Sequence, residues 1–261
     1  MDLRLAGRPA LVTASSSGLG AAIARRLAAE GCPVLVHGRD RVRAQAAADE
    51  LRSAGGVAET VLGDVTDPGD LDRIAAAATE FGVAILINNA GPVAQHDWRT
   101  GDERVWRDSW AGNVLSAVAL IRALVPPMRS AGWGRVINLG SRTATSPVPN
   151  LVDYGAAKAA VVNLTTALAK DLAGTGVTAN SVSPGVIVTE AMRAMFLADD
   201  PQGRDWASLE PELAQRYAPN PSGRLGTPDD VAATVTFLAS PLAGYLNGID
   251  VRVDGGLVGT P

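Results

Sequence analysis

Short runs of consecutive apolar residues, many of them β-branched, alternate along the chain with longer stretches rich in Ala, Leu, Arg and Glu. Because these short runs are apolar at neighbouring positions, they predict strands that are covered on both faces, as in a parallel sheet. The predicted strands are Ala10–Thr13, Pro33–His37, Ala58–Leu62, Val83–Asn88, Arg135–Leu139 and Val177–Ser183. The predicted helices between them are Gly18–Glu30, Arg41–Ser53, Asp70–Glu80, Asp102–Ala131 and Asp153–Ala173.

Repeated strand–helix–strand units imply right-handed crossovers and therefore a Rossmann-like, doubly wound α/β fold with helices on both faces of the sheet. The 261 residues, 47% of them hydrophobic, suffice for one large domain over positions 1–261. The rhythm breaks after Pro184, and residues 184–221 predict a helical, mobile insertion that serves as a lid over a site. A helix at Asp229–Leu238 and a last strand at Gly248–Val253 complete the fold.

Charge and cysteine content exclude several classes of protein. The net charge of −4 and the pI of about 5.2 do not fit the basic surface of a nucleic-acid binder. The single cysteine, Cys32, excludes an intramolecular disulfide and is expected to be a packed core residue, and two histidines leave little for a metal site. No apolar run has the length of a signal h-region or a membrane span, so we expect a cytoplasmic protein without a membrane partner.

The stretch "TASSSGLG" from Thr13 to Gly20 joins the first predicted strand to the first predicted helix. Gly18 and Gly20 would let a phosphate approach backbone N–H groups at the positive end of the helix dipole, and the serines at 15–17 would add hydroxyl donors. A tight strand-to-helix turn with a serine cap is the alternative. Ala14 stands where such turns usually begin with Gly, and we expect it to have a negative φ.

A second constellation carries groups suited to proton transfer. Tyr154 and Lys158 are four positions apart, on one face of a predicted helix, and Ser141 follows the fifth strand. A Tyr-x-x-x-Lys pair alone is usually a surface helix pair. Here the glycine turn and Ser141 both follow strands, and ligands bind at the carboxyl ends of the strands in doubly wound sheets.

With these motifs in this order, the chain resembles the short-chain dehydrogenase/reductases, most of all their 3-oxoacyl-carrier-protein reductase-like branch. Thr13–Gly20 resembles the T-G-x-x-x-G-x-G of that family, Asn88–Gly91 its N-N-A-G, and Pro184–Thr189 its P-G-x-x-x-T. The segment "GRLGTPDDVA" at 223–232 also resembles the family. The departures are Ala14 and Asn247.

The resemblance implies a catalytic set of Asn113, Ser141, Tyr154 and Lys158. Tyr154 would exchange a proton with the substrate oxygen, with its pKa lowered by the Lys158 ammonium and by the oxidised nicotinamide. Ser141 would hydrogen-bond the same oxygen. Lys158 would also hold the nicotinamide ribose, and Asn113 would anchor a water that connects Lys158 to solvent.

The resemblance also implies a dinucleotide site, for which NADP(H) is the preferred cofactor and NAD(H) is possible. Asp64 and Val65 resemble the pair that holds the adenine, with an Asp turn before Pro68 as the alternative. Asn89 is expected to brace the central strands. The cofactor set is Thr13, Ser15, Ser16, Ser17, Gly18, Leu19, Gly20, Arg39, Asp64, Val65, Asn89, Ala90, Gly91, Tyr154, Lys158, Pro184, Gly185, Ile187 and Thr189.

The choice between the two cofactors depends on the end of the second strand. NAD-using enzymes place an acidic residue there, whereas this chain has Gly38. Arg39 can reach a 2′-phosphate with a planar, charge-assisted fork, although an exposed turn arginine is the alternative. Asp40 could pair with Arg39 or repel a phosphate, and we expect it to point to solvent.

These observations predict an NADPH-dependent carbonyl reductase that acts on a small-molecule ketone, with 3-oxoacyl and polyketide-like ketones included. One alternative is a dehydrogenase that oxidises a sugar, polyol or steroid alcohol, and another is a dinucleotide-sensing or scaffold protein. A homotetramer is expected from the long helices Asp102–Ala131 and Asp153–Ala173 and from residues 244–256.

Several residues have two interpretations. Gln95 and His96 belong either to the rim of the substrate pocket or to a solvated loop. The aromatic residues Trp98, Trp106 and Trp110 are expected in packing or in a subunit interface. We favour an apolar lid over the substrate for three residues of the insertion, with core filling as the alternative: Met192, Met195 and Phe196.

Overall fold

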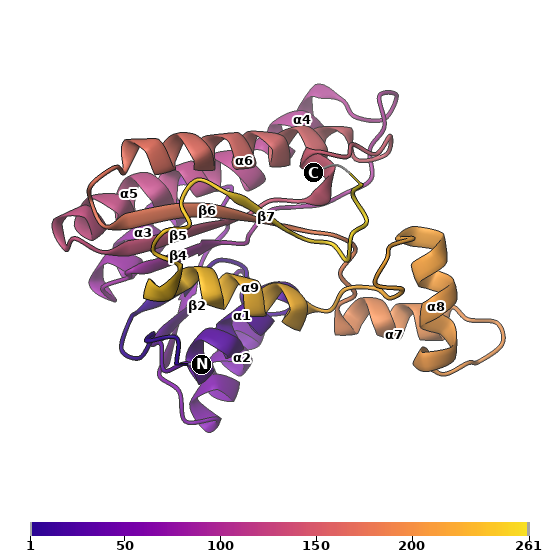
Figure 1. The fold of residues 1–261 in the computed structure, drawn as a ribbon, viewed down its shortest axis with the longest axis horizontal. Coiled ribbons are helices and arrows are strands. Elements are labelled where there is room, and N and C mark those ends of the chain that lie inside the picture. The colour runs from indigo at the N-terminus through magenta and orange to yellow at the C-terminus, as the bar shows by residue number, and fades with distance from the viewer. Residues whose placement is uncertain (1, 260–261) are drawn as a thin grey trace.

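The computed structural model describes residues 2–259, which form one parallel sheet with helices on both faces (Figure 1). In the described residues the sheet has seven strands in the order β3-β2-β1-β4-β5-β6-β7. The strands are β1 (Ala10–Val12), β2 (Val34–Gly38), β3 (Ala58–Leu62), β4 (Ile85–Asn88), β5 (Gly134–Leu139), β6 (Val177–Pro184) and β7 (Asp250–Val253). The predicted single-domain, doubly wound fold is confirmed.

Two layers of helices cover the sheet. The helices are α1 (Gly18–Ala29), α2 (Arg41–Ser53), α3 (Pro68–Glu80), α4 (Glu103–Trp110), α5 (Ser116–Ser130), α6 (Val152–Asp171), α7 (Glu190–Ala198), α8 (Trp206–Tyr217) and α9 (Pro228–Ala239). Helices α1 and α9 lie together on one face of the sheet, whereas α5 and α6 lie on the other (Figure 1).

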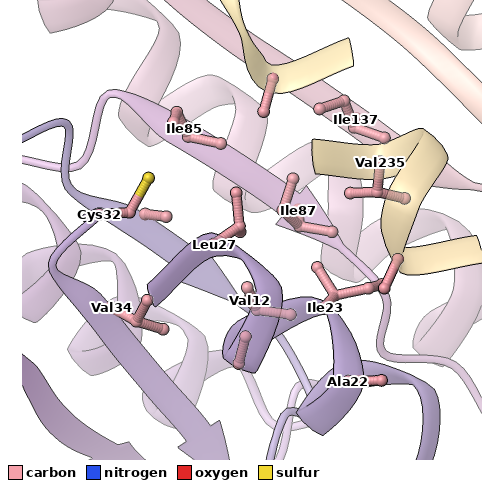
Figure 2. Packing of buried hydrophobic residues seen from close by; sticks show 14 of the residues in the cluster. Val12, Ala22, Ile23, Leu27, Cys32, Val34, Ile85, Ile87, Ile137 and Val235 are labelled. Atoms are coloured by element: carbon pink, nitrogen blue, oxygen red, sulfur yellow. The ribbon is translucent and has the colours of Figure 1, made fainter. Parts of the chain in front are cut away.

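The consecutive apolar residues of each strand divide between two cores, because neighbouring side chains of a strand point to opposite faces. Val12 and Ile87 belong to the cluster under α1 and α9, and Leu11 and Leu86 belong to the cluster under α3 and α5. Figure 2 shows Val12 and Ile87 packed with Ile23. Burial on both faces thus explains why the strand runs of this sequence do not alternate with polar residues.

Cys32 lies in the first of these clusters, at 1% exposure, with its Sγ 3.5 Å from the carbonyl of Leu5 (Figure 2). Burial raises the pKa of its thiol to about 12. A thiol with so high a pKa is a poor nucleophile near neutrality. The prediction of a small packed residue is confirmed.

The predicted helix Asp102–Ala131 is interrupted by a π-helical segment, Ala111–Leu115, between α4 and α5. Within it, Nδ2 of Asn113 donates to the carbonyl of Ser109, four residues earlier, at 2.9 Å. This side-chain hydrogen bond competes with the backbone N–H that would bond the same carbonyl in a regular α-helix. Such π segments are frequent at functional sites. In the described part of the chain, Glu103–Ser130 is the one helical stretch with the length and apolar composition of a membrane span, and half of its most apolar 18 residues are buried inside the protein.

The predicted insertion contains α7 and α8, which project from the main body beside the carboxyl ends of the strands (Figure 1). The two helices share a small core in which Leu209 and Leu213 are buried. Met192 and Phe196 pack against this core, which agrees with the core-filling alternative, and the side chain of Met195 remains half exposed.

Candidate active site

The turn after β1 adopts a backbone conformation that the sequence did not predict. Ala14 has a φ of +53°, so the expectation of a negative φ is wrong. The strain of a left-handed alanine costs about 1–3 kcal/mol and persists only where neighbouring contacts enforce it. Here the N–H of Ala14 donates to Nδ1 of His37 at 2.9 Å, and its carbonyl accepts from Nδ2 of Asn89 at 3.4 Å.

The two glycines of the turn serve different purposes. Gly18 has a φ of +56° and lines a surface hollow together with Ser17. Gly20 is buried, and a Cβ added to it would lie 2.3 Å from the carbonyl oxygen of Ala14. Gly20 therefore lets α1 pack directly on the turn, and its contact with a phosphate stays a prediction. Leu19 packs against the core under α1 and α9.

Thr13, Ser15 and Asn89 brace the turn from inside the protein. Thr13 Oγ1 accepts from the N–H groups of Asn89 and Ala90 at 2.9 and 2.8 Å. Asn89 Nδ2 donates to the carbonyl of Thr13 at 2.9 Å, which agrees with the bracing role predicted for Asn89. Ser15 is 0% exposed and its Oγ accepts from the N–H of His37, so its hydroxyl is engaged inside the turn, and its contact with a phosphate stays a prediction.

A hollow of about 350 Å³ lies at the carboxyl ends of β1 to β4, and we call it the β2–β3 hollow. It brings together seven residues predicted to hold a cofactor: Ser16, Ser17, Arg39, Asp64, Val65, Ala90 and Gly91. Its lining also includes His37 and Arg43, which the sequence analysis did not assign. Arg43 follows Arg39 by four positions, and this spacing was the available signal for a second cation.

Arg39 pairs with Asp64 across the mouth of the β2–β3 hollow, with its Nη1 3.2 Å from Oδ2. The Arg39 side chain is 77% exposed, and Asp40 accepts from the N–H of Arg43 as the cap of α2 instead of pairing with Arg39. Hydrogen bonds from Thr66 are the main cause of the lowered pKa of Asp64, to which Arg39 adds. The Asp turn considered as an alternative for Asp64 is present, since Thr66 bonds its carboxylate.

Gly38 leaves room for Ser16 in the wall of this hollow. A Cβ added to Gly38 would lie 2.8 Å from Oγ of Ser16. An acidic side chain at position 38, as NAD-using enzymes carry it, therefore does not fit unless Ser16 moves. The hollow thus presents two arginines and no carboxylate at the position of the ribose selector.

The predicted catalytic residues gather beyond the end of β5. Lys158 on α6 is buried, and its Nζ donates to the carbonyl of Leu139 at 2.8 Å and lies 5.6 Å from the centre of the Tyr154 ring. Ser141 Oγ lies 2.9 Å from Oγ1 of Thr143 and accepts from the N–H of Thr143 at 3.2 Å. Thr143 was not predicted, although a hydroxyl two residues after Ser141 was a usable signal.

The electrostatics of Tyr154 and Lys158 differ from the expectation. Burial raises the pKa of Tyr154, and its hydrogen bond with Ser141 offsets part of this effect, so the expected lowering is not found in this structure. Burial lowers the pKa of Lys158 to about 8. The acceptor of its hydrogen bond is the neutral carbonyl of Leu139, so no carboxylate offsets the cost of burying the charge. Both shifts favour the neutral forms, so Tyr154 keeps its proton firmly and the ammonium of Lys158 loses its proton more readily than an exposed lysine does.

Asn113 lies close to Lys158 and has a polar atom to spare. Its Nδ2 donates to the carbonyls of Ser109 and Pro92, whereas its buried Oδ1 has no hydrogen-bond partner among the described residues. A Cβ on Gly91 would lie 2.2 Å from this Oδ1 and 3.5 Å from Nζ of Lys158. The acceptor and the ammonium thus border the same small space, which suits the water-anchoring role implied for Asn113.

His96 ties the loop after β4 to the loop before α6. Its Nδ1 lies 3.3 Å from Oδ1 of Asp153, which is buried and directly precedes Tyr154. The backbone N–H of His96 donates to the carbonyl of Asn150 at 2.9 Å, and the N–H of Val152 donates to that of His96 at 3.3 Å. These contacts hold His96 against the start of α6, beside Tyr154. Trp98, 79% exposed, stacks on Trp106 with ring centres 5.8 Å apart in the same segment.

A second hollow, of about 620 Å³, lies between the start of α1 and α7, and we call it the α1–α7 hollow. Ser17 lines both hollows, so they meet at the turn after β1. Thr189 lines the α1–α7 hollow and caps α7 by accepting from the N–H of Met192. Gly185 and Ile187 line a neighbouring hollow of about 230 Å³ beside β7, which shares Gly226 with the α1–α7 hollow.

These two joined hollows fit an extended dinucleotide. Exposed glycine-turn backbone at a helix start suits the pyrophosphate, and the arginines of the β2–β3 hollow suit a further phosphate. Within residues 2–259, no group of three His, Cys, Asp or Glu side chains is placed to hold a metal ion.

Comparison with known proteins agrees with this geometry. The profile of a family described as "Enoyl-(Acyl carrier protein) reductase" matches residues 13–258. The chain is 37% identical to a 3-oxoacyl-[acyl-carrier-protein] reductase of Vibrio cholerae over 257 residues, which cover 98% of this chain and 99% of the relative. It is also 37% identical over 257 residues to a galactitol 2-dehydrogenase (L-tagatose-forming) of Cereibacter sphaeroides, covering 97% and 96% of the two chains.

Among solved structures, L-sorbose reductase from Gluconobacter frateurii, complexed with NADPH and L-sorbose, superimposes with a TM-score of 0.92 at 31% identity over 100% of both chains. The chain therefore belongs to the short-chain dehydrogenase/reductase family. It is an oxidoreductase of the kind that interconverts CH–OH and C=O groups.

Buried Lys158 makes a testable contribution to stability. Its folded pKa of about 8 lies below the ordinary value of 10.5, so burial of the ammonium destabilises the fold at pH 7 and this cost declines as pH rises from 8 to 10.5. Lys158→Met should raise the free energy of unfolding at pH 7 by about 1–3 kcal/mol, and less at pH 10, while activity falls. Thermal and urea unfolding at both pH values measure this change in the free energy of unfolding.

The control is Lys170→Met, which changes an exposed lysine of the same helix. A Lys158→Met protein that is less stable than the wild type at pH 7 would contradict the expectation.

Proposed function

We propose that the protein is an NADPH-dependent carbonyl reductase that converts a ketone to a secondary alcohol. The observation that carries the proposal is the convergence of Ser141, Tyr154, Lys158 and Asn113 at the same sheet edge as the joined hollows. A dinucleotide sensor or a scaffold needs no proton donor beside a hydroxyl and a buried ammonium, so this arrangement favours an enzyme.

The chain's own residues account for the proton transfer. When bound, the reduced nicotinamide supplies the hydride. Tyr154 donates its phenolic proton to the substrate oxygen, and Ser141, oriented by Thr143, donates a hydrogen bond to that oxygen as negative charge develops. The Lys158 ammonium stabilises the phenolate that remains on Tyr154. Burial raises the pKa of Tyr154, so the phenol keeps its proton near neutrality and is in the form that donates to the substrate oxygen.

The proposed preference for NADPH rests on the β2–β3 hollow. Arg39 and Arg43 line it, and Gly38 offers no carboxylate to hold the ribose hydroxyls or to repel a phosphate. Guanidinium groups bind phosphate through paired, charge-assisted hydrogen bonds. The NADPH complex of the related L-sorbose reductase supports the same choice.

An alternative substrate class is a sugar or polyol. The relatives include a galactitol dehydrogenase and an L-sorbose reductase as well as 3-oxoacyl reductases. A panel of 3-oxoacyl thioesters, cyclic ketones, ketoses and polyols, assayed in both directions with NADPH, NADH, NADP⁺ and NAD⁺, separates these classes. Ketone reduction with NADPH is the expected outcome. Quenching of protein fluorescence by NADPH without turnover of any compound would favour the sensor.

We further propose that residues 184–221 act as a lid. Helices α7 and α8 pack on a core of their own, and α7 forms one wall of the α1–α7 hollow. A unit that carries its own core can move as a rigid body about its connections, which suits closure over a bound cofactor and substrate.

A homotetramer is expected from two separate exposed apolar faces. Trp110 and Leu115 are exposed on the helical stretch that leads into α5, while Leu242 and Tyr245 are exposed near β7. Two distinct self-complementary faces on one chain generate four copies with two kinds of two-fold axis. Sedimentation at micromolar concentration should give four times the chain mass of 26.8 kDa, and Tyr245→Arg should give a dimer. A monomeric wild-type protein would overturn this expectation.

A further inference from the structure

His37 connects the turn after β1 with the ends of two other strands. It is 2% exposed, and its backbone N–H donates to Oγ of Ser15 at 3.0 Å while its carbonyl accepts from the N–H of Ser15 at 2.8 Å. Its Nδ1 accepts from the N–H of Ala14 at 2.9 Å, and its Nε2 lies 3.1 Å from the carbonyl of Gly63. All four polar atoms of His37 are therefore engaged, and the residue also lines the β2–β3 hollow.

These contacts determine the protonation state of the imidazole. An N–H group can only donate and a carbonyl can only accept. Nδ1, which accepts from Ala14, is therefore unprotonated, and Nε2, which donates to Gly63, carries the hydrogen. Burial favours the same neutral form because it lowers the pKa of His37. The charged groups that act on the ring are Asp64 and Asp70, which favour protonation, and Arg39, which opposes it.

The partner of Nδ1 is the residue with the left-handed backbone. Ala14, with a φ of +53°, precedes Ser16 and Ser17, which line the β2–β3 hollow. Alanine rarely adopts this conformation, so a contact that aims its N–H at a fixed acceptor helps to keep the turn in place.

We propose that neutral His37 is a positioning residue for the cofactor. It holds Ala14 in its left-handed conformation and connects the turn to the end of β3. These contacts fix the relative positions of the residues that line the β2–β3 hollow, where the adenosine phosphate half of the ligand would bind. The inference rests on the proposed use of NADPH. It adds a residue that acts through Ala14, since all its polar atoms are engaged within the protein.

Three substitutions separate the two ring contacts. His37→Leu removes both, His37→Asn keeps an acceptor at the place of Nδ1, and His37→Gln keeps a donor near the place of Nε2. The probe is 2′,5′-ADP, which carries the phosphate-bearing adenosine without nicotinamide, and its Kd is measured by calorimetry. His37→Leu should weaken binding about tenfold, the size expected for losing the Nδ1 hydrogen bond that holds Ala14, whereas His37→Asn should stay within about threefold of the wild type.

Ala14→Gly is the matched second change, because glycine adopts positive φ without strain. In the His37→Leu background it should recover most of the lost affinity, although it restores no contact to position 37. A merely structural role for His37 would lower the melting temperature and the affinity together, and Ala14→Gly would not recover the affinity selectively.

The pH dependence supplies a readout that requires no disruptive variant. Because burial lowers the pKa of His37 from the ordinary value of 6.5, protonation sets in only at a pH below that value, and it would place an N–H of the ring against the N–H of Ala14. The Kd of the wild type should then rise more steeply than that of His37→Asn, which keeps every other titrating group, the ligand phosphate included, but lacks the imidazole.

Each outcome bears on the inference. Equal affinity of wild type and His37→Leu, failure of Ala14→Gly to recover affinity, or identical pH profiles of wild type and His37→Asn would overturn it. A wild type that binds neither 2′,5′-ADP nor NADPH would refute the proposed cofactor itself, and this result is distinct from a wild type that binds both regardless of residue 37.

Discussion

Tyr154→Phe should lower kcat for ketone reduction by about 10²–10⁴-fold, the usual contribution of a positioned proton donor. The substitution removes only the phenolic oxygen, and the ring can stay in its place 5.6 Å from Nζ of Lys158. We therefore expect the affinity for NADPH to stay within about twofold of the wild type, since no ligand contact of the β2–β3 hollow changes. Steady-state kinetics with the best ketone, together with NADPH titration by fluorescence, provides the measurement.

Thr143→Val is the graded companion to this variant. It removes the hydroxyl that lies 2.9 Å from Oγ of Ser141 but leaves Ser141 and Tyr154 in place. A positioning role predicts a loss in kcat of about tenfold, smaller than that of Tyr154→Phe. A Tyr154→Phe protein that retains a large share of the wild-type rate would remove Tyr154 from the chemistry.

Arg39→Ala should abolish the preference for NADPH over NADH. A charge-assisted hydrogen bond to phosphate contributes about 1.5–3 kcal/mol, which corresponds to a preference of about ten- to a hundredfold in kcat/KM. Arg39 must leave Asp64 to bind the phosphate, and its 77% exposure and long side chain allow this exchange. The ratio of kcat/KM for NADPH and NADH, measured with one ketone, reports the effect.

Two control variants accompany Arg39→Ala. Arg41→Ala changes an exposed arginine of α2 that does not line the β2–β3 hollow, so the cofactor ratio should not move. Ala14→Gly should also leave the ratio unchanged, because position 14 shapes the turn and does not contact the 2′-phosphate. Equal use of both cofactors by the wild type, or an unchanged ratio in Arg39→Ala, would show that Arg39 is not the selector.

The fold could be predicted from the sequence because burial on both faces leaves an unmistakable pattern of short apolar runs. The prediction of β3 matches the observed bounds, and the other strands differ by two residues or fewer at each end. Helix α3 begins earlier than predicted because Asp67 caps it and Pro68 occupies its first turn. Helix interruptions were harder to predict, since the side chain of Asn113 in the π segment bonds both Ser109, four residues earlier, and Pro92 in a distant loop.

The site was predictable where its residues are close in sequence or belong to a motif, as with Tyr154 and Lys158. Contacts between strands could not be predicted in the same way. Arg39 contacts Asp64 because β2 and β3 pair in one particular register. The two residues are 25 positions apart, and the sequence alone does not give that register. The conformation of Ala14 was mispredicted because residue type alone favours negative φ, whereas the contact with His37 overrides that preference.

Direct hydride transfer between the nicotinamide and a ketone is the central claim, and isotope transfer tests it most directly. The protein is incubated with the ketone that it reduces fastest and with NADPH that carries deuterium on the transferred position of C4. The account predicts one deuterium on the carbinol carbon of each alcohol molecule, seen by mass spectrometry, and none on that carbon when unlabelled NADPH is used in D₂O. Alcohol without the cofactor's deuterium, or no alcohol from any ketone of the panel, would contradict it.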